Sequence, residues 1–181
     1  MLSAVLRDIS KLASMRTQLR CLALFVGLLV LPPFSHGAKM LHPDFPVIEG
    51  RYQMTKEWSV TLPEKFNRRI EDGDLVIWRP GVTLWIAVWG NDKNENADIR
   101  LKATRDDISP KAFDIQTSKT GHILRLTYRL KEGKDQGAVP AYYCFSFGDT
   151  GHVQMAIYLD NEQAVKSAQT ICGSLSENNA R

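Results

Sequence analysis

The chain has 181 residues and a formal net charge of +3, with 44% hydrophobic and 24% charged residues. The positive charge belongs to the first 38 residues, where Arg7, Lys11, Arg16 and Arg20 oppose only Asp8, so residues 39–181 are neutral overall. A neutral chain without a basic, aromatic-rich run lacks the electrostatic footprint of nucleic-acid binding, so we expect no nucleic acid among its partners. The length of residues 39–181 fits one ordinary domain with a sizeable core.

The first 38 residues have the layout of a secretory signal peptide. Arg16 and Arg20 precede an apolar run over residues 21–31, and small residues follow at 35–38. This is the order of an n-region, an h-region and a cleavage site. The apolar run is shorter than the roughly 20 residues that span a bilayer, and Met15 would start a leader of more usual length. The sequence therefore predicts a periplasmic or secreted protein that keeps no transmembrane segment after cleavage.

After the leader we expect an extended segment over residues 39–50, one domain over 51–175 and a flexible polar tail over 176–181. Apolar and polar side chains alternate over residues 52–62, which predicts a half-buried strand that Pro63 ends. Asp72-Gly73 then gives a strong hairpin signal.

The longest apolar stretch of the domain predicts a central β-hairpin. Two runs, residues 75–78 and 82–89, flank the turn sequence Arg79-Pro80-Gly81. Pro presets φ at the second turn position and Gly accepts a positive φ at the third. In this hairpin Trp78 would pair with Thr83.

The predicted hairpin is apolar on both faces, and one face carries three of the four tryptophans. That face holds Val76, Trp78, Trp85, Ala87 and Trp89, and the other holds Leu75, Ile77, Val82, Leu84, Ile86 and Val88. Strands that are apolar on both faces are usually central, with a layer against each side. Helices predicted at residues 91–107 and 160–175 would supply those layers. The alternative leaves Trp78, Trp85 and Trp89 partly open as an aromatic patch for a ligand or partner.

The rest of the chain alternates helices and hairpins. In order, we expect a surface helix over residues 91–107, hairpins over 112–130 and 141–159 joined by a polar loop at 131–140, and a last helix from residue 160. Asn91 or Asn94 would cap the first helix, and Asp160 the last. The apolar stripe of the last helix consists of Val165, Ala168, Ile171, Cys172 and Leu175.

Two cysteines remain after the leader. Pairing of Phe147 with His152 would put Cys144 on an apolar strand face, and the helix stripe that contains Cys172 has to cover such a face. In an oxidising compartment the two would form a strand-to-helix disulfide. The alternative is a pair of reduced, buried thiols that act as small apolar groups.

Helices on an antiparallel sheet define an α+β fold, here with about six to seven strands, a mid-chain helix and a C-terminal helix. The order of elements resembles the Mog1/PsbP-like fold, on the stretches GDLVIWRPGVTLWIAVW, followed by a helix, and HVQMAIYLD, which leads into the closing helix. It is also similar to small exported bacterial proteins with those stretches. The resemblance covers most of residues 52–175 and implies a non-catalytic accessory or binding protein. It transfers no functional residue.

A Thr-Gly-His motif occurs twice, at His122 and His152, each time at the start of a strand. In a meander both imidazoles lie at the same end of the sheet, where Asp149 would be a third metal ligand. However, alternate strands lie about 9.6 Å apart, whereas two nitrogens on one zinc ion lie within about 4 Å. We therefore favour no metal site and no cofactor, and explain the repeat by similar turn chemistry.

Two function hypotheses remain at this point. The first is a non-enzymatic exported binding protein that contacts a protein partner or a small apolar ligand in the cell envelope. Its contact surface would be the aromatic face with Trp78, Trp85 and Trp89 or the loop at residues 131–140. The second is a small exported hydrolase or metal-dependent enzyme that uses His122 or His152 with Asp149. Neither a G-x-S-x-G motif nor a phosphate-binding glycine loop occurs in the sequence.

Overall fold

The computed structural model describes residues 40–133 and 139–178. These residues form nine β-strands, two α-helices and one short 3₁₀ helix. In chain order they are β1 (Val47–Gln53), β2 (Trp58–Glu71), β3 (Asp74–Arg79), β4 (Val82–Gly90), α1 (Ala97–Asp106), β5 (Phe113–Thr120), β6 (Ile123–Leu130), β7 (Ala141–Phe147), β8 (Gly151–Leu159), η1 (Glu162–Ala164), α2 (Val165–Gly173) and β9 (Ser176–Glu177).

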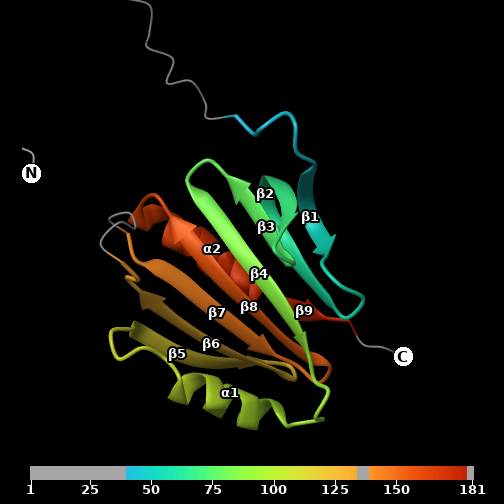
Figure 1. Ribbon diagram of the computed structural model, residues 1–181, viewed down its shortest axis with the longest axis vertical. Helices are drawn as coiled ribbons and strands as arrows, with labels where there is room; N and C mark the ends of the chain where they lie inside the picture. Colours follow the sequence, from blue (N-terminus) through green and yellow to red (C-terminus); the bar gives the residue numbers. More distant parts are fainter. Residues whose placement is uncertain (1–39, 134–138, 179–181) are drawn as a thin grey trace, which may run out of the picture. The chain divides into compact units, whose positions relative to one another are not determined.

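All strands join one antiparallel sheet, with the order β1-β2-β3-β4-β8-β7-β6-β5 and β9 added on β2 (Figure 1). The predicted α+β class is confirmed, but nine strands replace the expected six to seven. One of the extra strands is β9, because the first two residues of the predicted tail pair with Trp58 and Ser59 of β2. No helix in the described ranges is long and apolar enough to cross a membrane.

The strand predicted over residues 52–62 is in fact two strands. β1 begins within the segment that was expected to be merely extended, and β2 continues through Pro63 instead of ending there. The pairing of β1 with β2 is irregular at this point, because Gly50 faces Leu62 whereas Ile48 faces Phe66. Proline has no N–H to donate, so an irregular position of this kind tolerates it inside a strand.

The central hairpin has the predicted register. β3 and β4 pair Trp78 with Thr83, and Gly81 in the connecting turn has a φ of +88°. The Asp72-Gly73 turn between β2 and β3 has positive φ at both residues, as expected of a two-residue hairpin loop. Local turn chemistry and alternation therefore fix the centre of this sheet.

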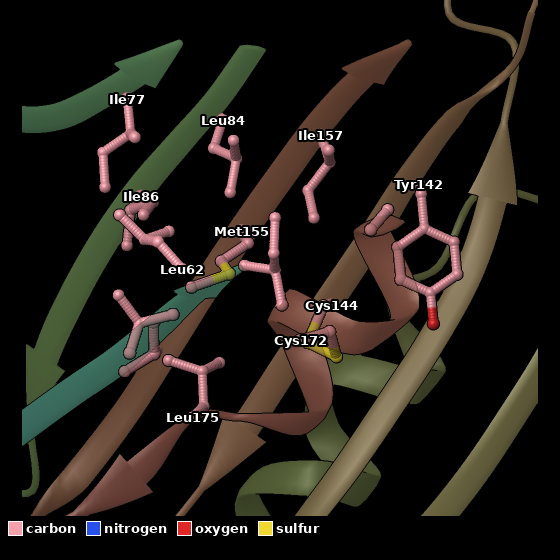
Figure 2. Close-up of a cluster of buried hydrophobic side chains, with 14 of the residues drawn as sticks. Leu62, Ile77, Leu84, Ile86, Tyr142, Cys144, Met155, Ile157, Cys172 and Leu175 are labelled. Carbon is pink, nitrogen blue, oxygen red and sulfur yellow. A yellow bond between two sulfur atoms is a disulfide. The ribbon is translucent and has the colours of Figure 1, made fainter. Parts of the chain in front are cut away.

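One face of the sheet is buried under α2 and forms the larger core (Figure 2). The predicted α2 stripe packs here against residues from β2, β3, β4, β7 and β8. The fully buried residues of this larger core include Leu62, Ile77, Leu84, Ile86, Met155, Ile157 and Leu175. Burying each such side chain contributes roughly 1.5–3 kcal/mol. Cys144 and Cys172 form the predicted disulfide in the middle of this core, and their Cα atoms are 6.1 Å apart.

The opposite face has a smaller core, and α1 covers only part of it. The core consists of Leu126, Tyr128, Ala141, Tyr143, Phe145 and Phe147, with Leu101 and Ile108 packed against it. Figure 1 shows α1 near β5 and β6, at the edge of the sheet opposite β1, and its contacts are with β6 and β7. The expectation that this helix covers the central hairpin is wrong, because α1 leads directly into the edge strand β5.

The helix caps differ by a few residues from the predicted ones. Asn96 caps α1 by accepting a hydrogen bond from the Asp98 N–H at 2.9 Å. Asn161, and not Asp160, accepts from the Ala164 N–H at 3.0 Å and so starts the turn that leads into α2. Asn91, a predicted cap, instead holds the loop before α1 together, since its side chain accepts from the Glu95 N–H at 2.9 Å.

Candidate functional site

The three tryptophans of the hairpin lie on one face, as predicted, but in different environments. Trp78 is half-buried because the Phe45 ring packs on it at 4.8 Å and the Arg69 guanidinium lies 5.2 Å from its ring. Trp85 is also half-buried, between Val76 and Ala156 on the neighbouring strands. Trp89 is 55% exposed. The structure therefore leaves one tryptophan of the predicted patch open, at the end of β4.

Trp89 ends a row of stacked rings that runs into the smaller core. Its indole stacks on His152 at 6.2 Å, and His152 stacks on Phe147 at 5.4 Å. The row continues through Phe145 and Tyr128 at 6.3 and 6.1 Å. Stacked aromatic pairs contribute about 0.5–1.5 kcal/mol beyond their buried area. The indole of Trp89 is thus held in place from one side and open to solvent on the other.

A groove of about 820 Å³ lies beside Trp89. It exists because β3 pairs with β4 only as far as Ile86, so that the last residues of β4 have β8 as their one strand neighbour. The buried Trp58 and the end of β4 line it, and polar side chains surround them. These polar residues are Thr55, Lys56, Glu57, Asn91, Asp92, Asn94, Asp149, Thr150 and Asn178.

A cluster of polar groups borders this groove at the β7–β8 turn, with Glu177 at its centre. The Glu177 carboxylate accepts hydrogen bonds from the Asp149 N–H at 2.9 Å and from the Thr150 N–H and hydroxyl. The Nε2 atom of His122 lies 2.7 Å from Glu177 Oε2. Burial acts to raise the pKa of Glu177, but these hydrogen bonds outweigh it and the net pKa is lowered.

Gly148 makes room for this carboxylate. A Cβ atom at that position would overlap the carboxylate oxygens of Glu177. Only glycine allows the side chain to approach the turn so closely. The turn and the last strand are therefore closely packed against each other, although Asp149 and Glu177 are 28 positions apart in the sequence.

The two histidines of the repeated motif lie at the same end of the sheet, as predicted, but not together. β7 lies between their strands β6 and β8. His122 meets Glu177, whereas His152 is stacked between Trp89 and Phe147. Burial, and then the nearby charge of Arg100, lowers the pKa of His152. Of the predicted metal candidates, the structure brings His122 and Asp149 together and separates His152 from them.

Arg100 and Glu177 are the site residues that the sequence did not indicate. Arg100 extends from α1 and donates to the Gly148 carbonyl, while its Nε and Nη1 atoms find no hydrogen-bond partner within the described residues. Burial lowers the pKa of Arg100, opposed by the charges of Glu177, Glu95 and Asp149. A hollow of about 460 Å³ is lined by Arg100, His122 and Asp149. No local motif marks either residue, because their roles depend on how distant elements meet.

The cysteines and the loop at residues 131–140 are the remaining candidates. The disulfide leaves neither Cys144 nor Cys172 as a free nucleophile. The loop predicted at residues 131–140 is only partly described, since 134–138 lie outside the described residues. At its beginning, Glu132 accepts a hydrogen bond from the Tyr158 hydroxyl at 3.2 Å.

The fold and site define a disulfide-bonded α+β protein with one large antiparallel sheet. Searches against protein-family models, curated proteins and solved structures find no match.

Proposed function

We propose that this is an exported, non-enzymatic binding protein that holds a protein partner of the cell envelope at the groove beside Trp89. The observation that carries the proposal is the 55% exposure of this one indole at the open end of an aromatic row whose other end is buried. A large aromatic side chain fixed in place is the usual anchor of a protein interface.

The surroundings of Trp89 favour a protein partner over a small apolar ligand. Hot spots of protein interfaces combine a central aromatic anchor with a polar rim. The groove has this composition, because Asn, Asp and Thr side chains border its two tryptophans. Pockets for small apolar ligands are lined mainly by apolar side chains instead. The bordering loop is also held in place before binding, since Asn91 donates to the Asp149 carbonyl at 3.0 Å.

Export is supported by two features of the chain. The predicted leader is one, and the buried disulfide is the other, because disulfides persist in oxidising compartments. The resemblance to the Mog1/PsbP-like fold is a further argument for a non-catalytic role and remains a prediction. The alternative, a small hydrolase or metal-dependent enzyme that uses His122 or His152 with Asp149, stays a prediction: His122 lies near Asp149, whereas His152 stacks on Trp89.

Affinity capture from envelope extract with a matched pair of variants tests the proposal. Trp89→Ala removes the exposed anchor, and Ile99→Ala removes an equally exposed apolar side chain (58%) from α1 as the control. We expect a partner that binds the wild type and Ile99→Ala but is lost with Trp89→Ala. With the purified partner, Trp89→Ala should raise the dissociation constant about 30-fold. This corresponds to a loss of about 2 kcal/mol of binding free energy, the size of a hot spot. A partner that binds all three proteins equally would place the interface elsewhere.

A further inference from the structure

Three side chains that commonly bind metals converge at the β7–β8 turn. His122 comes from the residue before β6, Asp149 from the turn itself and Glu177 from β9. One ligand atom from each lies within 4.8 Å of the others. We propose that these residues form a binding site for a divalent transition-metal ion such as Zn²⁺, next to the partner surface around Trp89, with which it shares only Asp149.

The distances need only small adjustments to fit an ion. Zinc bonds to imidazole nitrogen and carboxylate oxygen are about 2.0–2.2 Å long, so two ligand atoms of one ion lie within about 4.4 Å of each other. The Nε2 atom of His122 and Oε2 of Glu177 are 2.7 Å apart, a hydrogen-bond distance, so an ion bound by both would replace this hydrogen bond and move the two atoms slightly apart. Among the described residues the Asp149 carboxylate has no hydrogen-bond or ion-pair partner, so its side chain is free to turn towards the ion.

Hydrogen bonds to Glu177 and to the backbone of Asp149 hold two of the three ligand residues in place before an ion binds. The Glu177 side chain is only 3% exposed, and the turn donates its hydrogen bonds to both carboxylate oxygens. The side chain of Asn91 holds the carbonyl of Asp149. Groups that orient metal ligands in this way typically change metal affinity 10- to 100-fold. The clearance at Gly148 allows the carboxylate to reach its position.

The ligand set and the charges indicate which ion fits. An imidazole with two carboxylates suits zinc and its first-row neighbours, whereas calcium and magnesium prefer oxygen ligands alone. The carboxylates of Glu177, Glu95 and Asp149 lie near the Arg100 guanidinium. Asp98 and Lys119 also line the hollow, so the charged side chains described around the site sum to a net negative charge that favours a divalent cation. Three protein ligands leave a further coordination position open. This position is accessible, because the His122 side chain is 42% exposed and lines the hollow of about 460 Å³.

Zinc titration of the purified protein, by calorimetry and native mass spectrometry, tests the site. We expect one ion per chain in the wild type, and a dissociation constant at least tenfold higher in His122→Ala and in Asp149→Asn. The matched control is His42→Ala, since His42 is an exposed imidazole beside a single carboxylate, Asp44, at 3.8 Å. The control and Trp89→Ala should bind zinc like the wild type, which separates this site from the proposed partner surface.

Cobalt provides a second readout that does not depend on affinity alone. When Co²⁺ binds through His122, its visible absorption should change in the wild type and in His42→Ala, but not in His122→Ala. Absence of a stoichiometric ion in the wild type would overturn the proposal. Equal loss of binding in the His42 and His122 variants would overturn it as well, because it would indicate nonspecific binding to exposed imidazoles.

Discussion

The two faces of the sheet carry similarly apolar sequences but have different environments. On one face, α2 and the Cys144–Cys172 disulfide close a core in which Trp58 is 1% exposed. On the other face, α1 covers β6 and β7 and leaves Trp89 55% exposed. Apolar alternation on a strand therefore predicts which residues share a face, but not whether a helix covers that face.

The difference follows from where each helix is connected. α2 follows β8, a strand in the middle of the sheet, so the returning chain lies over central strands. α1 lies between β4 and the edge strand β5, so it runs along the far side of the sheet. The uncovered part is the region around the end of β4, where the groove and the polar cluster lie.

The largest effect is expected from Trp58→Ala, which removes the buried tryptophan of the α2-covered face. Its side chain belongs to the larger core and is almost completely buried. Truncating a buried tryptophan costs about 3–5 kcal/mol because it removes buried area and leaves a cavity. Chemical denaturation followed by circular dichroism measures this loss. A loss below about 1 kcal/mol would mean that this core is not the stable side of the molecule.

Removal of the disulfide should cost somewhat less. The double variant Cys144→Ala, Cys172→Ala opens a covalent loop with a sequence separation of 28 residues. The chain-entropy relation gives about 3–4 kcal/mol for a loop of this size. Denaturation midpoints of the double variant and the wild type give the difference. Hydrogen exchange should also show earlier opening of α2 than of β3 and β4, and uniform opening would argue against a specific role in holding that helix.

How much of this could be predicted depends on how local each signal is. The register of the central hairpin and the stripe of α2 are confirmed, because turn residues and periodicity lie within one short stretch. The disulfide is confirmed because the strand face and the helix stripe each placed a cysteine in the core. For Trp89 the predicted sheet face is correct, but the sequence did not show how far the helices cover that face.

The remaining parts have no local signal. β9 consists of two polar residues, too few for any periodicity, and it forms because α2 ends beside β2. The buried Arg125 helps by donating to the Leu175 carbonyl at 2.7 Å. Glu177 could not be recognised as a site residue while residues 176–181 were expected to be a tail. Arg100 could not be recognised either, because its contact with the β7–β8 turn depends on how α1 lies on the sheet.

Trp89→Ala, on the opposite face, should change stability far less than Trp58→Ala. The indole is mostly exposed, and what it loses is its stacking on His152. Such a pair contributes about 0.5–1.5 kcal/mol, so we expect a loss of about 1 kcal/mol or less. The same denaturation experiment measures it, with Ile99→Ala as the exposed control. A loss similar to that of Trp58→Ala would show that Trp89 belongs to a core, and the proposed contact surface would then be wrong.

The smallest effect should be a pH dependence that comes from the partly exposed His152. Burial and Arg100 lower its pKa in the folded protein, so the unfolded chain binds more protons between the folded pKa and the usual value near 6.5. Stability should therefore fall as the pH decreases below about 6.5.

The variant His152→Asn keeps a planar polar side chain without this titration, and its stability should vary less with pH over that range. The comparison uses unfolding free energies of the wild type and of His152→Asn at several pH values between 5 and 8. If His152→Asn keeps the wild-type dependence, His152 is not held neutral by its neighbours, and the aromatic row is more open to water than the structure indicates.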